Sequence, residues 1–213
     1  MRILPEKEVV SMKTGFNESQ TRINLMRAFA GECQSRQRYY QAALIAQKKK
    51  LVGIERMFRF TADQEERHAM VFWKRLKDSA GGNIDFTAGF PADVYEDIQQ
   101  LIDASAAEEE KEYSIVYPDF ARIASEEGFS DIASDFRMVA DIEKCHNARF
   151  SYYGGLHRSG KLFRSDDTEQ TWICLNCGHI HKGSEPPQEC PLCRAAQGYF
   201  IRENEAAFTS SEM

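Results

Sequence analysis

Apolar residues recur at helical spacing along four long stretches of the chain. Within each stretch, large apolar side chains stand three, four and seven residues apart, which places them on one face of an α-helix. We expect helices over residues 18–50, 54–78, 93–127 and 130–155. Asn17 is the expected N-cap of the first helix, and Pro118 is expected to kink the third.

The connections between these stretches differ in length. A short break near residues 50–53 and a stop at Gly128 lie within two helix pairs, whereas the glycine-rich segment 79–92 joins the pairs. Two antiparallel hairpins joined by one long crossover are typical of ferritin-like four-helix bundles. We therefore expect a mainly α fold, with a ferritin-like bundle over residues 1–157 whose first 16 residues form an irregular arm.

The sequence changes character after the fourth stretch. Residues 158–170 are polar and are expected to form a linker, and residues 171–213 combine turn residues with paired cysteines. A module of roughly 35 residues has too small a core to fold without a staple, which a bound metal can supply. We expect a second, small β/loop domain there, with a metal at its centre and a short tail.

Acidic residues lie inside all four apolar stripes. The acids and histidines on these faces are, in chain order, Glu32, Glu65, His68, Glu109, Glu112, Glu143 and His146. A lone helical glutamate is usually a solvated surface acid. Several buried carboxylates in register, however, are very costly unless they are paired or bound to metal.

The spacing of these residues indicates a site for two metal ions. An i, i+3 pair points both side chains the same way. One Glu from each of two helices, with Glu-x-x-His from the other two, is the pattern of di-iron carboxylate sites in helix bundles. The chain has this set and one further acid, Glu112. Carboxylate and imidazole ligands suit iron, so we expect two irons bridged by carboxylates and oxide, with the seven residues as metal-binding and catalytic groups.

Four of the six cysteines form the most specific local signal. They make two Cys-x-x-Cys knuckles, at Cys174, Cys177, Cys190 and Cys193. Such knuckles bind one tetrahedral metal and leave no open position for a substrate. From the ligands alone this metal is either iron, for electron transfer, or zinc, for structure. Cys33 and Cys145 flank the expected di-iron ligands, and we expect both to be small buried fillers.

Composition excludes several classes of partner. The net charge is −6, with 42% hydrophobic and 28% charged residues, which is ordinary for a globular protein and favours neither nucleic acid nor anionic membrane as a partner. No apolar run reaches the length of a membrane span. The first residues do not form an evident signal peptide, so we expect a cytoplasmic protein. No Gly-x-Gly-x-x-Gly unit is present for a nicotinamide of its own.

Longer strings around these motifs point to one family. They are Ala28-Phe29-Ala30-Gly31-Glu32, residues 61–69 (Thr-Ala-Asp-Gln-Glu-Glu-Arg-His-Ala), Glu112-Tyr113 with Tyr117-Pro118, and the ending Cys-x-x-Cys-Gly … Cys-Pro-x-Cys. In this order, over about residues 20–202, the chain resembles the rubrerythrins. The resemblance implies a ferritin-like di-iron domain followed by a rubredoxin-like Fe(Cys)₄ domain, and a peroxidase that reduces hydrogen peroxide to water. Glu108 departs from the family pattern, where a small residue is expected, and we expect it to point off the core face.

The resemblance also implies roles for individual residues. The di-iron ligands would be Glu32, Glu65, Glu109, Glu112, Glu143 and His146, with His68 alternating with Glu112 when the oxidation state changes. Tyr39 and Tyr117 match tyrosines that hydrogen-bond near the cluster. The rubredoxin-like iron would pass on electrons from an external NAD(P)H-linked donor protein, in a homodimer or tetramer.

Two other functions stay open on the sequence. A ferroxidase or iron-storage protein would use the same bundle inside a closed shell of many subunits, but it has no evident use for a rubredoxin-like module. A zinc-ribbon adaptor would need zinc at the four cysteines and an idle bundle. Hydrogen peroxide and dioxygen fit the same ligands as oxidants, and the sequence does not separate them.

Overall fold

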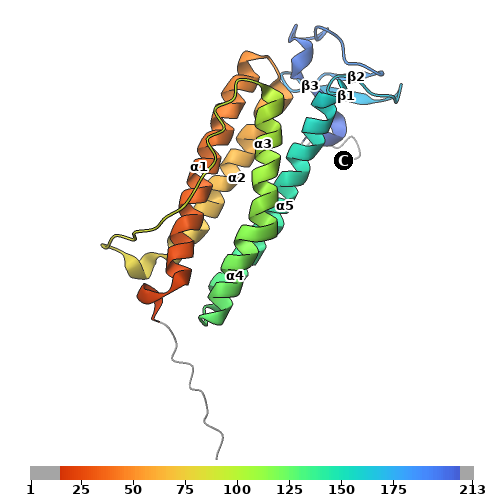
Figure 1. Ribbon diagram of the computed structural model, residues 1–213. Coiled ribbons are helices and arrows are strands. Elements are labelled where there is room, and N and C mark those ends of the chain that lie inside the picture. The colour runs from red at the N-terminus through yellow and green to blue at the C-terminus, as the bar shows by residue number, and fades with distance from the viewer. Residues whose placement is uncertain (1–14, 207–213) are drawn as a thin grey trace, which may run out of the picture.

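The structure, a computed structural model of the chain, describes residues 15–206. Figure 1 shows a bundle of long helices with a small sheet at one end. The helices are α1 (Gln20–Lys48), α2 (Val52–Arg75), α3 (Ile98–Lys111), α4 (Tyr117–Glu126) and α5 (Ser130–Arg158). The strands are β1 (Thr171–Cys174), β2 (Ile180–Lys182) and β3 (Phe200–Arg202). The mainly α fold predicted from the apolar periodicity is confirmed, and none of the described helices is long and apolar enough to cross a membrane.

Two helical hairpins build the bundle and divide its core into two apolar clusters. α1 packs along α2, and α5 packs along α3 and α4. One cluster includes Leu25, Phe72, Tyr117, Ile132 and Phe136. The other includes Tyr39, Phe58, Leu101, Ile102 and Phe150. On every helix the acidic positions fall between the residues of these clusters, so a polar layer lies across the middle of the bundle, enclosed by apolar packing on both sides.

The helix ends differ from the expected ends because side-chain caps set them. Ser19, not Asn17, caps α1: its side chain accepts a hydrogen bond from the Arg22 N–H, and Asn17 lies in a preceding 3₁₀ turn. α3 begins five residues later than expected, where the Asp97 side chain accepts from the Gln100 N–H. The irregular arm expected over residues 1–16 lies, except for its last two residues, outside the described part of the chain.

The third predicted helix is interrupted before its proline. A π-helical turn, Glu112–Val116, separates α3 from α4, and Pro118 lies in the first turn of α4. A proline inside a regular helix clashes with the carbonyl four residues earlier, but the wider π turn relieves that crowding. The kink expected at Pro118 is therefore replaced by a π turn directly before it, and this turn contains Glu112.

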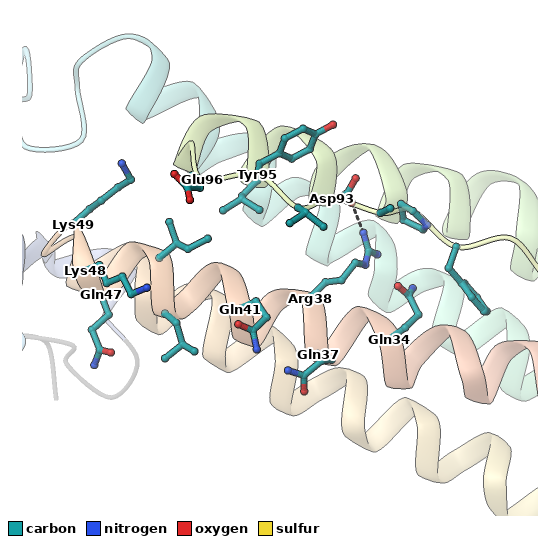
Figure 2. Close-up of a pocket in the computed structure, with 17 residues that line it drawn as sticks. Gln34, Gln37, Arg38, Gln41, Gln47, Lys48, Lys49, Asp93, Tyr95 and Glu96 are labelled. Carbon is teal, nitrogen blue, oxygen red and sulfur yellow. Dashed lines mark hydrogen bonds and ion pairs between the residues drawn. The ribbon is translucent and has the colours of Figure 1, made fainter.

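The long connection between the hairpins is extended chain that runs back beside α1 (Figure 1). Arg38 forms an ion pair with Asp93 at 2.5 Å, and Arg27 Nε donates to the Thr87 carbonyl at 3.0 Å. Between α1 and this connection lies a cavity of about 980 Å³, shown in Figure 2, whose walls include Gln37 and Tyr95. None of the expected metal ligands lines this cavity.

The small C-terminal module is a three-stranded antiparallel sheet with strand order β2-β1-β3. Its core contains Trp172, Cys174, Cys190 and Phe200. The module packs against the end of the bundle where α1 turns into α2. There Arg56 donates to the Leu175 carbonyl at 3.0 Å, and the Tyr152 hydroxyl donates to Glu205 at 2.6 Å. The two parts of the chain are therefore in direct contact.

Candidate metal centres

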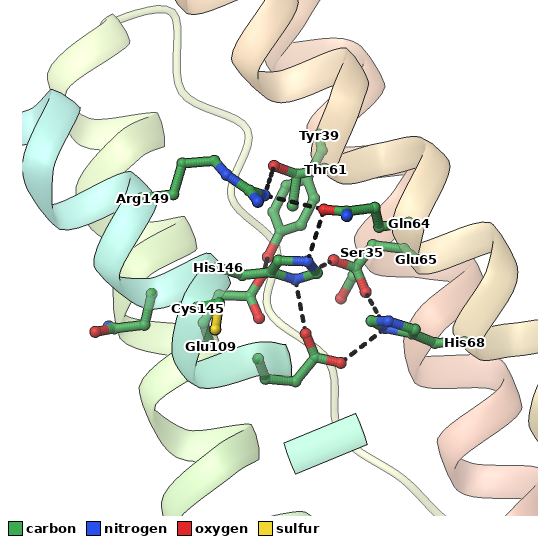
Figure 3. Close-up of polar contacts among 12 residues, drawn as sticks. Ser35, Tyr39, Thr61, Gln64, Glu65, His68, Glu109, Cys145, His146 and Arg149 are labelled. Carbon is green, nitrogen blue, oxygen red and sulfur yellow. Dashed lines mark hydrogen bonds and ion pairs between the residues drawn. The ribbon is translucent and has the colours of Figure 1, made fainter. Parts of the chain in front are cut away.

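The polar layer of the bundle brings side chains from all four expected helices to one place. Figure 3 shows Glu65, His68, Glu109 and His146 converging there. Two sets of ligand atoms each lie within 4.8 Å of one another: Glu32, Glu65, His68 and Glu143, and Glu65, Glu109, Glu143 and His146. Because Glu65 and Glu143 belong to both sets, the arrangement suits two neighbouring metal ions that share two carboxylates.

The two imidazoles occupy equivalent places in the two sets. His68 Nδ1 lies 2.9 Å from Glu143 and 3.4 Å from Glu65. His146 Nδ1 lies 2.7 Å from Glu143 and 2.9 Å from Glu65. The rings stack with their centroids 5.5 Å apart. Glu112 is buried close by but belongs to neither set, so in this structure His68, and not Glu112, faces the shared carboxylates.

Unsatisfied buried atoms show that these residues fit a cation. Buried polar atoms in proteins nearly always have hydrogen-bond partners. Here the following atoms have none among the described residues: Glu32 Oε2, both oxygens of Glu65 and of Glu143, Glu109 Oε2, and the Nδ1 atoms of His68 and His146. All of these belong to the two ligand sets, and outside the sets the described residues have only Asn24 Nδ2 and Arg38 Nε in the same condition. This concentration of lone pairs is what a pair of multivalent cations would satisfy.

Burial and mutual repulsion change the protonation of the acids. Burial, together with the neighbouring carboxylates, raises the pKa of Glu32, Glu109 and Glu112 well above the usual value. Burial also raises the pKa of Glu65, but its close contacts with the His146 and His68 rings outweigh burial and hold that pKa low. For His146, burial lowers the pKa, and close contacts with the Glu109, Glu143 and Glu65 carboxylates outweigh burial and raise the pKa to about 11. The metal-free cluster therefore holds protons at neutral pH.

Two buried tyrosines each hydrogen-bond one carboxylate of the cluster. The Tyr39 hydroxyl donates to Glu109 Oε1 at 2.6 Å, and the Tyr117 hydroxyl donates to Glu32 Oε1. Burial and these facing acids raise the pKa of both tyrosines well above the usual value. The tyrosines therefore stay protonated. The free oxygen of Glu32, Oε2, lies 3.5 Å from His68 Nδ1, whereas in Glu109 the tyrosine-bound Oε1 itself lies 3.6 Å from His146 Nδ1.

A small cavity of about 120 Å³ lies beside this cluster, under the crossover. Glu112 and Tyr117 line it from the bundle, and Phe90 lines it from the crossover. Glu108, expected to point off the core face, has a mostly buried side chain, 14% exposed: it lines the same cavity and pairs with Lys111 at 3.5 Å. The position that departs from the family pattern is therefore close to the cluster.

Gln64 and Arg149 are polar neighbours of the cluster that the sequence reasoning did not select. Gln64 Oε1 lies 3.1 Å from His146 Nε2 and accepts a hydrogen bond from Arg149 at 3.1 Å. A signal was present for both: Gln64 precedes Glu65 directly, and Arg149 follows His146 by three residues, on the same helical face.

The four paired cysteines converge in the small module. Cys174 Sγ lies 3.8 Å from Cys193 Sγ, and Cys177 Sγ lies 3.7 Å from Cys190 Sγ, with all four sulfurs within 4.8 Å of one another. A hydrogen bond from the Asn176 side chain lowers the pKa of the Cys193 thiol to about 6, so a thiolate forms readily there. The four sulfurs fit one tetrahedral metal.

The prediction that Cys33 and Cys145 are buried is wrong. Both are exposed. Each is one residue from an inward-facing ligand, Glu32 or His146. One residue turns an α-helix by about 100°, so a neighbour of a ligand points sideways, away from the core.

Comparison with known proteins identifies the family of the chain. The sequence pattern of the rubrerythrin family matches residues 24–153, and that of the rubredoxin-like domain of rubrerythrin matches residues 172–201. The chain belongs to the rubrerythrin family. It is therefore a di-iron carboxylate protein with a second iron site at four cysteines, in a family whose members are generally oxidoreductases.

Relatives match nearly the whole chain. A rubrerythrin of Clostridium perfringens is 40% identical over 183 residues, which are 85% of this chain and 93% of that protein. A rubrerythrin of Porphyromonas gingivalis is 37% identical over 194 residues, 91% of this chain and 95% of that protein. The structure of fully reduced, all-ferrous nigerythrin is 28% identical, with a TM-score of 0.59 and 91% of each chain covered. A bacterioferritin of Desulfovibrio desulfuricans, 18% identical with a TM-score of 0.60 over 67% of this chain and 82% of that one, shares the fold alone.

Proposed function

We propose that the protein is a peroxidase that reduces hydrogen peroxide to water at the di-iron site. The electrons arrive through the four-cysteine iron site from an NAD(P)H-linked donor protein in the cytoplasm, and the working unit is a homodimer or tetramer. The observation that carries the proposal is the cluster itself. Two overlapping ligand sets adjoin a cavity of about 120 Å³, and a rubredoxin-like module, whose chemistry is electron transfer, is packed on the same bundle.

The two ligand sets assign residues to each iron. Glu32 and His68 would hold one iron, Glu109 and His146 would hold the other, and Glu65 and Glu143 would bridge them. Glu112 is buried and stands outside both sets, and it would take the place of His68 as a ligand when the oxidation state of the iron changes. Bound in this way, the two irons supply the two electrons that cleavage of the peroxide O–O bond needs.

The protein groups around the cluster bind the substrate and orient the iron ligands. Reduction of hydrogen peroxide to two waters consumes two electrons and two protons, and the substrate is about as small as a water pair. The cavity beside Glu112 and Tyr117, of about 120 Å³, is large enough to admit it. Tyr39 and Tyr117 hold Glu109 and Glu32 in place by donating their hydroxyl protons. Ligands fixed before the reaction reorganise little during it.

The four-cysteine module is placed to deliver electrons. It contacts the bundle through Arg56, whose guanidinium donates to the carbonyl next to Cys174. The knuckle formed by Cys190 and Cys193 exposes Leu192, which is 68% accessible, beside the half-buried Cys193. A donor protein can approach the iron site from this exposed knuckle while the opposite side of the module rests on the bundle.

A stopped-flow experiment tests the proposal. The iron-loaded protein is fully reduced without oxygen, mixed with one equivalent of hydrogen peroxide, and followed by the visible Fe(III)–thiolate absorption of the four-cysteine site, with dioxygen in a parallel run. Fast recovery of the band with peroxide and slow recovery with dioxygen is expected. A band that stays bleached while the di-iron site oxidises would overturn the proposed electron path, and faster recovery with dioxygen would overturn peroxide as the substrate.

A matched pair of variants tests the cluster. Glu112→Gln removes a carboxylate beside the cavity, and Glu110→Gln changes an exposed acid two residues earlier. We expect Glu112→Gln to lose most peroxide turnover, and Glu110→Gln to keep it. Equal turnover in the two variants would contradict the assignment of Glu112. Shell assembly of the purified protein, in place of a dimer or tetramer, would favour iron storage.

A further inference from the structure

We infer that Gln64 and Arg149 are positioning residues that fix the ring orientation and the tautomer of His146, so that its Nδ1 lone pair faces the di-iron site. The inference rests on the ligand role proposed for His146. It concerns a chain of hydrogen bonds that leads away from the cluster, drawn in Figure 3 from His146 through Gln64 to Arg149 and Thr61.

The contacts in this chain are short and come from two helices. His146 Nε2 lies 3.1 Å from Gln64 Oε1 on the side of the ring away from the carboxylates. Arg149 Nη1 donates to the same Gln64 oxygen at 3.1 Å and to Thr61 Oγ1 at 2.9 Å. The Thr61 hydroxyl in turn donates to the Met57 carbonyl at 3.0 Å. The chain thus runs without a gap from the His146 ring to the backbone of α2.

The chemistry of arginine decides where the protons lie. A guanidinium only donates hydrogen bonds, so the Gln64 amide atom that faces Arg149 must be its oxygen. That same oxygen faces His146 Nε2, and it can only accept, so Nε2 must carry a proton. In the neutral imidazole that metal binding requires, the lone pair then lies on Nδ1. Nδ1 is the atom 2.7 Å from Glu143 and 2.9 Å from Glu65.

Arg149 is itself held in place. Its guanidinium stacks over the Phe60 ring, 5.0 Å from the ring centroid, and Thr61 fixes one of its nitrogens. Arg149 also lines a cavity of about 660 Å³ between the bundle and the four-cysteine module, with Cys174 in the same lining. The chain of hydrogen bonds therefore begins at the boundary between the two parts of the protein and ends at a proposed iron ligand.

His68, the second imidazole, lacks such support. Its Nδ1 faces the same carboxylates, but within residues 15–206 no hydrogen bond forms at its Nε2. The two histidines occupy symmetrical places in the ligand sets, yet only His146 is fixed from behind. One imidazole of the site is therefore held from behind and the other is not. The one that is not held is His68, the histidine expected to exchange with Glu112.

Iron affinity tests the role of Gln64 without relying on turnover. Full-length protein with its four-cysteine iron in place is titrated with Fe(II) under anaerobic conditions, in competition with a chelator. We expect Gln64→Leu, which removes the acceptor, to weaken iron binding by about 10-fold or more, as is typical for loss of a group behind a metal-bound histidine. Gln64→Glu, which keeps an oxygen at the same place, should not weaken it. The exposed residue Gln47 on α1 supplies the control, Gln47→Leu.

A double-mutant cycle tests whether Arg149 acts through Gln64. Arg149→Met lets the Gln64 amide rotate, so we expect weaker iron binding than in the parent but a smaller loss than in Gln64→Leu. The losses should not add in the double variant, because both changes break one chain. Arg137→Met, at an exposed position of the same helix, is the control. Far-ultraviolet circular dichroism, which is dominated by the helices, reports folding of the bundle in every variant. Should Gln64→Leu not fold, Gln64→Asn, whose amide stops short of the ring, replaces it.

The reduction potential separates positioning from mere packing. A carboxylate behind the imidazole makes it a stronger donor to iron, so Gln64→Glu should lower the midpoint potential of the di-iron site. Unchanged affinity in Gln64→Leu, equal losses in Gln64→Leu and Gln64→Glu, or additive losses in the double variant would overturn the inference. A protein that binds iron as expected here but does not reduce peroxide would contradict the proposed activity and leave this inference standing.

Discussion

Five buried carboxylates face two imidazoles in the middle of the bundle, and the charges of these residues do not balance without a cation. Burial and repulsion raise the pKa of Glu32, Glu109 and Glu112, and close contacts with the acids raise that of His146 to about 11. The metal-free cluster reduces its charge by holding protons, and iron takes their place. At the residue scale, protons and metal therefore compete for the same atoms.

Iron loading should therefore release protons near pH 7. Groups whose pKa is raised are protonated in the metal-free protein and lose their protons when the metal binds, so iron affinity should increase as the pH rises from about 6 to 8. Anaerobic Fe(II) titration in weakly buffered solution with a pH indicator measures the release. A titration without proton release, with an affinity that does not change with pH, would contradict the expected protonation.

The Tyr39 hydroxyl is expected to stabilise the fold through Glu109. Tyr39→Phe leaves a buried carboxylate oxygen without its donor, which costs about 1–3 kcal/mol. Urea unfolding of the metal-free protein measures this change in the free energy of unfolding. Tyr95→Phe, at a side chain that is 40% exposed, is the control and should change stability little. Equal stabilities of the two variants would argue against the Tyr39–Glu109 bond.

At the scale of elements, the apolar stripes predicted the order and facing of the helices, because helical periodicity is a local property, but they predicted one helix where α3 and α4 stand. The helix ends were predicted less well. α3 starts at Ile98 because Asp97 caps it, while the preceding segment is drawn out along α1 by the Arg38–Asp93 ion pair. The π turn at Glu112–Val116 has no periodicity signal of its own. Each of these features depends on a partner far away in the sequence or on a single side chain.

Replacement by alanine should change the free energy of unfolding in opposite directions at two glycines, one after a helix and one inside a helix. Gly128, which follows α4, has φ +87° with open space around its Cβ position. Gly128→Ala should therefore lower the free energy of unfolding by about 1–2 kcal/mol through backbone strain alone. Gly155 lies in α5, also with open space, so Gly155→Ala should gain about 0.5–1 kcal/mol. Urea unfolding compares the two. Equal shifts would show that backbone conformation does not control these positions.

At the scale of the whole molecule, the four-cysteine module rests on the bundle through a very close approach of backbones. A Cβ added at Gly198 would lie 1.8 Å from the Lys50 carbonyl oxygen, at the turn between α1 and α2. Arg56 and Tyr152 hold the same boundary by hydrogen bonds. The placement of one iron site relative to the other within the chain therefore depends on a glycine that no metal motif includes.

Gly198→Ala should push the module away from the bundle. We expect overpacking to lower the free energy of unfolding by about 1–3 kcal/mol. We also expect slower transfer of electrons from the four-cysteine iron to the di-iron site of the same chain. Gly82→Ala, where the nearest atom to an added Cβ is 3.7 Å away, is the control. Thermal unfolding and single-turnover kinetics measure both effects. Unchanged stability would show that the boundary is loose. Unchanged kinetics with reduced stability would show that electrons do not cross this contact.

The sequence by itself determined the helical bundle, the ligand types and the two metal motifs. The i, i+3 spacing of Glu65 and His68 and the Cys-x-x-Cys knuckles are local patterns, and their geometry follows from the backbone around them. The predicted burial of Cys33 and Cys145 was wrong, because a shift of one residue turns a side chain away from the core.

Only the tertiary structure decided which of these residues share a metal. Glu65 and Glu143 come from different helices and belong to both ligand sets, and Glu112 stands outside both. Packing also brought Gln64 and Arg149 behind His146, and Gly198 against Lys50. These relations are distances between helices and domains. Side-chain packing sets such distances across the whole molecule, so no local sequence pattern determines them.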